Sequence, residues 1–257
     1  MPVPYPAIDD SLAVEVLRAI GAERADPVET IVHRFRSWLP AGSTAKWVAA
    51  DAGDVPPGAD PRTGIDARLG GSHESWSCWV LCTGLGAVLA AAGHDVRVAV
   101  EHHRRTDVVD FHSVLIVDGE LVDPYLGPSA PVAPGHDVSR PDAWVEWVPG
   151  ERPDHLGLRG GGGTFRYRML GDRLERRDVE AFCEVSVTHS GVGRRRYAHW
   201  LAGPRLCFVR EGDDGQAELR VTEGDDPFQQ RRRLVERGPY EELRARIDDP
   251  TAIEVTA

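Results

Sequence analysis

A run of fifteen residues without a charged side chain constrains this sequence more than any other feature. It spans residues 78–92, "CWVLCTGLGAVLAAA", and a glycine follows it directly. The run is longer than most strands and is apolar on every side of a helix, which predicts a buried helix. Ser75 or Ser77 is the expected N-cap, and the glycine is the expected C-terminal stop. Two of the four cysteines, Cys78 and Cys82, lie one turn apart on this helix.

Composition and charge limit the possible classes of protein. The chain has 257 residues, enough to bury a sizeable core, and 41% of them are hydrophobic, as in ordinary globular proteins. A formal net charge of -11 argues against nucleic acids and anionic membranes as partners, and it leaves the oligomeric state open. The first residues do not resemble a signal peptide, and no apolar run is long enough for a membrane span. We therefore expect a cytoplasmic protein with free thiols, and the preference for arginine over lysine is typical of a bacterium with a GC-rich genome.

The order of the expected elements indicates an α+β fold. Apolar residues at helical spacing predict two helices within residues 11–39, and the Gly- and Pro-rich segment 40–71 is expected to be loop with one short helix. The buried helix is followed by strand-like segments, first at 95–100 and then at 111–127. Later strand-like segments include "TFRYRML", "FCEVSV", "RLCFVRE" and "AELRVTEG", and a final helix is expected near 227–247. This order predicts an antiparallel sheet or barrel in the middle of the chain.

A β-hairpin in this region places a histidine near an aspartate. Asp118 and Gly119 are a two-residue turn signal between two alternating runs. If they are the loop residues, Val114 lies opposite Asp123, and His112 shares a face with Val114 because side chains alternate along a strand. His112 and Asp123 are then diagonal neighbours, about 7 Å apart between their backbones. The carboxylate is thus placed where it can orient the imidazole.

Cys78 at the start of the buried helix completes a reactive set. The unpaired N–H groups of a helix N-terminus and the helix dipole favour a thiolate, and a nearby histidine favours it further. The same N–H groups can hold the oxyanion of a tetrahedral intermediate. A nucleophile, a base and an orienting carboxylate in the order Cys78, His112, Asp123 predict an acyl-transfer site.

These motifs resemble those of the arylamine N-acetyltransferases, which belong to the wider transglutaminase-like cysteine enzymes. "RLGG" and "SCWVLCTGLGAVLAAAG" are similar to the family's Arg-Gly-Gly-x-Cys segment and the helix that it opens. "FHSVLIV" and "VDPYLG" are similar to its histidine strand and its aspartate hairpin end. The resemblance covers residues 68–127. It implies Cys78 as the acyl-accepting nucleophile, His112 as its base and Asp123 as the orienting residue.

The resemblance also implies an architecture and substrates. It predicts an N-terminal helical bundle at 1–75, a nucleophile helix with an antiparallel β-barrel or sheet at 76–195, and a C-terminal α/β lid at 196–257. It implies acetyl-CoA or another acyl-CoA as the acyl donor, and an amine such as an arylamine or a hydrazine as the acceptor. No tightly bound cofactor and no metal are expected.

Three departures from the family pattern keep other activities open. Segment 72–77, "SHESWS", has six residues where the family has one, "DPYLG" replaces Asp-x-Gly-Phe-Gly, and the Pro-Phe-Glu-Asn segment is missing. The alternatives are a transglutaminase-like amide hydrolase or deamidase, and an amide synthase of secondary metabolism, each with the same triad. A further alternative is a non-catalytic binding domain.

Several residues near the triad have two interpretations. Four aromatic residues are candidates for the lining of an acceptor pocket, with core packing as the alternative. They are Trp76, Trp79, Phe111 and Tyr125. Cys82 is interpreted as a packing residue, because free cysteine is among the most buried residue types. The arginine runs 194–196 and 231–233 are interpreted as solvated faces, with contacts to the phosphates of coenzyme A as the alternative.

Overall fold

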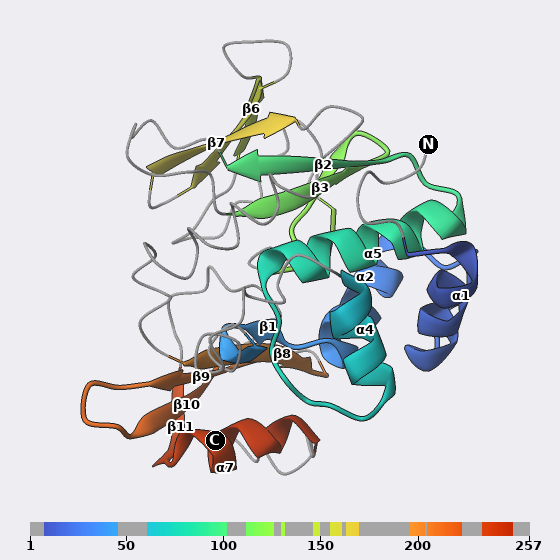
Figure 1. The fold of residues 1–257 in the computed structure, drawn as a ribbon. Helices are drawn as coiled ribbons and strands as arrows, with labels where there is room; N and C mark the ends of the chain where they lie inside the picture. The colour runs from blue at the N-terminus through green and yellow to red at the C-terminus, as the bar shows by residue number, and fades with distance from the viewer. Residues whose placement is uncertain are drawn as a thin grey trace.

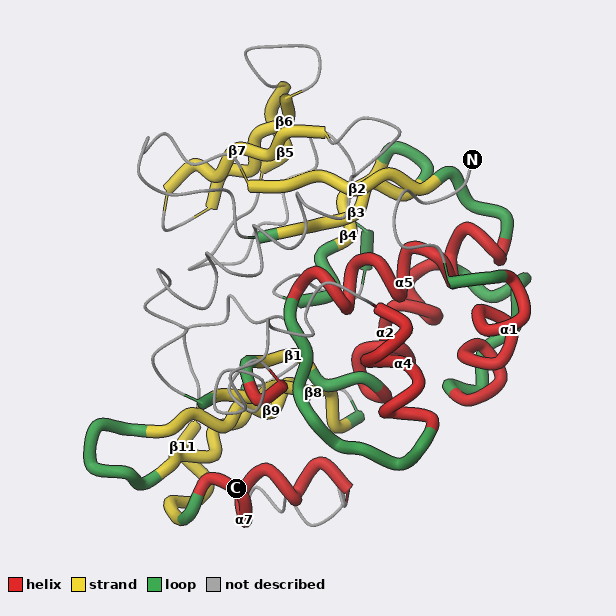
Figure 2. The backbone as a smooth tube through the Cα atoms, in the orientation of Figure 1, coloured by secondary structure: helices red, strands yellow, loops and turns green. Residues whose placement is uncertain are grey.

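The protein has an α+β fold in which helices and two antiparallel sheets lie around one central helix (Figure 1). The helices of the first hundred residues gather on one side, the strands form an upper and a lower group, and the C-terminal helix lies with the lower group (Figure 2). The predicted α+β class is confirmed. The computed structural model describes residues 8–45, 61–101, 112–125, 130–131, 146–149, 155–160, 163–169, 196–203, 205–222 and 233–248.

Among the described residues, three helices precede the central one. They are α1 (Asp10–Ala19), α2 (Val28–Trp38) and α4 (Pro61–Leu69). The Asp9 carboxylate caps α1 by accepting a hydrogen bond from the backbone N–H of Leu12 at 2.9 Å. The apolar faces of these helices pack against the central helix, which buries their leucine, isoleucine and phenylalanine side chains. The two helices predicted within 11–39 and the short helix within 40–71 are confirmed.

The central helix, α5 (Cys78–Ala92), has the predicted ends. Ser77 is at the N-cap position, and Gly93 ends the helix with a φ of 104°, a left-handed conformation that favours glycine. All residues from Cys78 to Leu89 are buried. The helix therefore needs no polar face, and its lack of charged residues follows from packing on every side.

The upper sheet contains six strands in the order β4-β3-β2-β7-β6-β5. Their bounds are β2 (Val96–Glu101), β3 (Ser113–Val117), β4 (Glu120–Val122), β5 (Glu146–Pro149), β6 (His155–Gly160) and β7 (Gly163–Met169). Strands β2 and β3 pack on α5. Within the described residues β4 and β5 are edge strands, so these six strands form an open sheet and not the closed barrel that was the alternative. The predicted strand "FCEVSV" lies outside the described residues.

The lower sheet contains five strands in the order β1-β8-β9-β10-β11. Their bounds are β1 (Ala41–Gly42), β8 (Tyr197–Ala202), β9 (Arg205–Glu211), β10 (Ala217–Val221) and β11 (Arg233–Gly238). Helix α7 (Tyr240–Arg244) and the short 3-10 helix Ala245–Asp248 follow, and α7 lies against this sheet (Figure 1).

The prediction of one final helix over 227–247 is wrong for residues 233–238. These residues pair with β10 as an edge strand, and helix α7 begins only after Pro239. Gly238 and Pro239 interrupt a helical pattern, and an edge strand with one solvated face has the mixed polar composition that also suits a helix.

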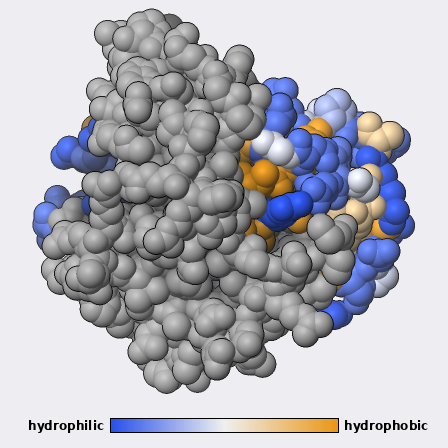
Figure 3. All heavy atoms as spheres, turned by 90° about the horizontal axis from the view of Figure 1, so that it is seen from above, coloured by the Kyte–Doolittle hydropathy of each residue, from blue (hydrophilic) through white to orange (hydrophobic). Residues whose placement is uncertain are grey.

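Two hydrophobic cores lie on opposite sides of the lower sheet. The larger surrounds α5, and the smaller lies between the sheet and α7, where Trp200, Leu219 and Leu243 are buried. Seen from above, hydrophilic residues dominate the outer side of the helical part (Figure 3). Among the described helices none is both long and apolar enough to cross a membrane. The domain boundaries after residues 75 and 195 stay predictions.

Candidate functional site

The β3–β4 hairpin has the predicted register. Its strand pairs are Leu115 with Val122, Ile116 with Leu121 and Val117 with Glu120. Asp118 and Gly119 form the turn, with φ values of 51° and 88° that match the left-handed conformation required by a two-residue turn. His112 directly precedes β3 and Asp123 directly follows β4. The turn therefore brings these two residues to the same end of the hairpin.

His112 and Asp123 form a buried hydrogen bond. The distance from His112 Nε2 to Asp123 Oδ2 is 2.9 Å, and each side chain is less than a tenth exposed. The other oxygen, Asp123 Oδ1, accepts the backbone N–H of Tyr125 at 2.9 Å. An ionised carboxylate can only accept hydrogen bonds, so Nε2 carries the hydrogen and Nδ1 remains for a second partner. This arrangement fixes both the tautomer and the orientation of the imidazole.

Cys78 is the first residue of α5 and is that second partner. It makes a side-chain hydrogen bond with His112, and its own side chain is buried. Since Nε2 is engaged by Asp123, the bond to Cys78 falls to Nδ1. The structure thus brings the three predicted residues together: Cys78 from the start of a helix, and His112 and Asp123 from the open end of a hairpin. Their catalytic roles stay predictions.

The surroundings of His112 favour its charged form. Burial is the largest single influence and lowers the pKa of His112, but the charge of Asp123 and the hydrogen bonds to Asp123 and Cys78 raise it well above its ordinary value. An imidazolium next to Cys78 stabilises a thiolate there. The set can therefore exist as a thiolate–imidazolium pair, which is the reactive form of a cysteine nucleophile.

Cys82 lies one turn further along α5 and is fully buried. Its Sγ donates a hydrogen bond to the backbone oxygen of Ser113 at 3.0 Å. Burial, followed by the charges of Asp123 and Cys78, raises the pKa of Cys82 well above its ordinary value. A fully buried neutral thiol fits the interpretation of Cys82 as a packing residue, and its hydrogen bond also attaches α5 to the strand that follows His112.

The aromatic candidates divide into two groups. Tyr125 lies next to the site, with its ring centroid 5.8 Å from that of His112. Trp76 and Trp79 are almost fully buried and belong to the core around α5. Phe111 lies outside the described residues. The structure therefore places the ring of Tyr125 next to that of His112.

An aromatic group on the lower sheet was not predicted from the sequence. The ring of His199 is 5.0 Å from that of Tyr125, and it is nearly parallel to the rings of Tyr197 and Phe208, with which it forms a cluster of three rings. Burial raises the pKa of Tyr197, and the charge of Cys78 raises it further. The ring of Tyr197 is 6.4 Å from that of Tyr125, next to His112. Strand β8 carries Tyr197 and His199 at alternate positions, so the period of two in "YAHWLA" was the signal that could have found them.

The additional segment 72–77 is built into the fold. The backbone N–H of Trp76 donates to Pro40 O at 2.9 Å, and the N–H of Gly42 donates to Trp76 O at 2.8 Å. The N–H of Ala45 donates to the oxygen of Ser75 at 3.2 Å. The segment thus runs along residues 40–45, of which Ala41 and Gly42 pair with β8.

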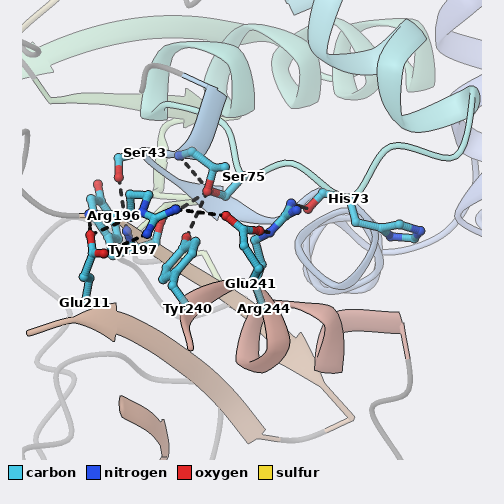
Figure 4. Close-up of polar contacts among 10 residues, drawn as sticks. Ser43, His73, Ser75, Arg196, Tyr197, Glu211, Tyr240, Glu241 and Arg244 are labelled. Carbon is cyan, nitrogen blue, oxygen red and sulfur yellow. Dashed lines mark hydrogen bonds and ion pairs between the residues drawn. The ribbon is translucent and has the colours of Figure 1, made fainter. Parts of the chain in front are cut away.

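Arg196 is engaged in ion pairs and does not need a phosphate partner. It forms two hydrogen bonds with the Glu211 carboxylate at 2.8 and 3.2 Å and one with Glu241 at 3.1 Å. Its guanidinium carbon is 4.9 Å from the ring centroid of Tyr240 (Figure 4). Arg194, Arg195, Arg231 and Arg232 lie outside the described residues. For Arg196 the alternative role of binding coenzyme A therefore has no support.

The architecture defines a class of α+β folds in which a buried helix presents a cysteine at its N-terminus to a hairpin with histidine and aspartate. Solved structures identify the particular fold. The chain resembles a variant of the Mycobacterium smegmatis arylamine N-acetyltransferase with a TM-score of 0.64 and 18% identity, over 96% of this chain and 93% of that one. It resembles the Nocardia farcinica arylamine N-acetyltransferase with a TM-score of 0.62 and 19% identity, over 97% and 90%.

A third solved structure is a complex with a ligand. It is the Mycobacterium marinum arylamine N-acetyltransferase in complex with CoA, with a TM-score of 0.55 and 16% identity, over 92% of this chain and 98% of that one. No model of a known protein family matches the sequence, and no curated protein matches it. The resemblance to the arylamine N-acetyltransferases is confirmed by structure, and the protein has their fold.

Proposed function

We propose that the protein is an acyltransferase that moves an acyl group, acetyl in the first instance, from a coenzyme A thioester to an amine such as an arylamine or a hydrazine. The observation that carries this proposal is the hydrogen-bonded set of Cys78, His112 and Asp123 at the N-terminus of a buried helix. The fold supports the choice of donor, because a solved structure with the same fold is described as a complex with CoA.

The first half of the reaction forms an acyl-enzyme. The Cys78 thiolate attacks the carbonyl carbon of the thioester, and a carbon–sulfur bond to Cys78 forms. The first N–H groups of α5 have no partner within the helix, so they can stabilise the oxyanion of the tetrahedral intermediate. The bond to the sulfur of coenzyme A then breaks, and the leaving thiolate takes the proton from the His112 imidazolium.

The second half transfers the acyl group to the amine. The amine nitrogen attacks the acyl carbon, and neutral His112 accepts a proton from that nitrogen through Nδ1. The carbon–sulfur bond to Cys78 breaks, which releases the amide and restores the thiolate–imidazolium pair. Asp123 keeps the imidazole in one orientation and stabilises its charged form throughout.

Intact-mass spectrometry of the protein mixed with acetyl-CoA tests the proposal. We expect a gain of one acetyl group that maps to Cys78, that disappears in Cys78→Ala, and that is removed by addition of an arylamine or a hydrazine. The matched control is Cys82→Ala, which keeps the candidate nucleophile and should still be acetylated. Release of ammonia from amide substrates without acetylation by any acyl-CoA would support the amide hydrolase or deamidase instead. An unreactive Cys78 would support the binding domain.

A further inference from the structure

A chain of buried hydroxyl groups connects the C-terminal part of the protein to the loop before the nucleophile helix (Figure 4). Ser75 Oγ donates to Thr44 Oγ1 at 2.8 Å, and Thr44 Oγ1 is 2.9 Å from the hydroxyl oxygen of Tyr240 on α7. These three side chains, which we name the hydroxyl chain, are no more than 5% exposed. Because water does not reach them, each hydroxyl depends on its neighbour for its hydrogen bond.

The hydroxyl chain also holds the backbone of β8 next to the site. Ser75 Oγ accepts the backbone N–H of Thr44 at 3.1 Å and lies 3.3 Å from the backbone oxygen of Tyr197. Ser43 binds both polar backbone atoms of Tyr197: its N–H donates to Tyr197 O at 3.0 Å, and its Oγ accepts from Tyr197 N at 3.2 Å. The ring of Tyr197 is 6.4 Å from that of Tyr125, which lies next to His112, so the network connects to the candidate site through β8 as well as through the loop before Cys78.

The segment at 42–44, the loop at 72–77 and strand β8 approach one another so closely that position 42 admits only glycine. A Cβ atom on Gly42 would lie 2.3 Å from Tyr197 O and 2.4 Å from Ser75 Oγ. Both distances are far shorter than any van der Waals contact. The absence of a side chain at Gly42 therefore allows the loop at 72–77 and strand β8 to approach the chain at this position.

Ion pairs surround the hydroxyl chain on its outer side. Arg244 donates to His73 O at 3.1 Å and to Glu241 at 3.0 Å, and Arg196 covers the ring of Tyr240 (Figure 4). The bond from Arg244 to His73 O is partly buried and links α7 directly to the loop at 72–77. The hydroxyl chain is a second connection between α7 and this loop, and its side chains are buried.

We propose that Tyr240 is a positioning residue for the reaction and acts through Thr44 and Ser75 on the start of α5. This inference rests on the proposed function. Ser75 lies three residues before Cys78, and its position sets the path by which the chain enters the helix. A shift of about 1 Å in a reacting group is sufficient to slow a reaction strongly. Loss of the Tyr240 hydroxyl removes one of the two side-chain hydrogen bonds of Thr44 Oγ1 and keeps only the one with Ser75, and the loop then relaxes away from the geometry that joins Cys78 to His112.

Alkylation of Cys78 by iodoacetamide at a series of pH values tests this inference without any acyl donor. Peptide mass spectrometry assigns the label, and the buried Cys82 and Cys207 are internal references. We expect Tyr240→Phe, which keeps the ring, to lower the rate at Cys78 near pH 6.5 by about three- to tenfold, the value of one hydrogen bond. The midpoint of the pH profile should move toward that of an ordinary thiol, about 8.5.

Thr44 provides a conservative pair of variants. Thr44→Val removes the hydroxyl at nearly constant shape and should behave as Tyr240→Phe does, whereas Thr44→Ser keeps the hydroxyl and should keep the wild-type profile. Arg237→Gln is the matched control, because it removes an ion pair with Glu218 on the same sheet, away from the hydroxyl chain. A purely structural role would lower the melting temperature of Tyr240→Phe and Thr44→Val but leave the profile of the folded protein unchanged.

The outcomes separate the inference from the proposed function. A wild-type midpoint near 8.5 would overturn the proposed function and, with it, the inference. A low wild-type midpoint that Tyr240→Phe and Thr44→Val leave in place would overturn the inference alone. If Tyr240→Phe does not fold, the two Thr44 variants decide. Equal pH profiles of Cys78 alkylation in Thr44→Val and Thr44→Ser would contradict a role of the hydroxyl chain. A higher midpoint in Thr44→Val alone would support it.

Discussion

Replacement of Asp123 by asparagine should remove the charge that keeps His112 protonated. The two side chains are 2.9 Å apart and less than a tenth exposed. At this distance two unit charges attract each other with about 6 kcal/mol at an effective dielectric constant of about 20. Loss of one partner from a buried pair costs about 3–5 kcal/mol. The pKa of His112 should therefore fall, because burial then acts without the compensating charge of Asp123.

The consequence for Cys78 can be measured directly. Histidine NMR signals followed against pH give the titration of His112, and mass spectrometry gives the rate of acetylation of Cys78 by acetyl-CoA. We expect this rate at neutral pH to fall by about 10²- to 10⁴-fold in Asp123→Asn, the usual contribution of a positioned acid or base.

Asp118→Asn is the matched control for this change. Asp118 is on the same hairpin and contacts a different histidine, His94, with 2.6 Å between Oδ2 and Nδ1, but its side chain is half exposed. Its replacement should change the acetylation rate less than about twofold, because solvent screens an exposed pair. An Asp123→Asn variant with the wild-type titration of His112 and the wild-type acetylation rate would refute the reasoning.

Three further predictions concern stability and pH. Cys82→Ala should lower the free energy of unfolding by about 1–3 kcal/mol, since it creates a small cavity and removes the bond to Ser113; Cys82→Ser should recover part of the loss, as measured by urea titration. Leu85→Ala on fully buried α5 should cost about 2–5 kcal/mol, whereas Leu234→Ala, which is 41% exposed, should change the melting temperature little. The raised pKa of His112 stabilises the folded protein fully below about pH 6.5 and progressively less as the pH rises through the folded-state pKa. The difference in unfolding free energy between wild type and His112→Gln should therefore shrink from pH 6 to pH 9, and a difference that grows would contradict the assigned direction.

The parts of the site that depend on local geometry were predictable from the sequence. The Asp118-Gly119 turn determines the register of its hairpin, and the register determines that His112 and Asp123 meet. The C-terminal end of α5 follows equally from a local signal, Gly93 after the apolar run. In both cases fewer than twenty residues contain all the information, because turn conformation and helix capping are short-range effects.

The parts that depend on pairing between distant segments were not predictable. Strand β1 has two residues, and it forms only because Ala41 pairs with His199, more than 150 residues later. The aromatic group with Tyr197 and His199 reaches Tyr125 by the same pairing. The edge strand β11 was mistaken for a helix because its partner β10, and not its own composition, decides its conformation.

The attachment of α5 to the hairpin has a consequence for how the site works. Near the site Cys82 binds the backbone of Ser113, and at the far end the turn residue Asp118 binds both His94 and the backbone N–H of Asp95, just after the helix. Hydrogen bonds thus join the helix to the hairpin both near the site and at the far end. The chain enters the helix at Cys78 through the loop before it. That loop is the segment at 72–77. We therefore expect its contacts with the C-terminal part of the chain to influence the reactivity of the Cys78 thiol.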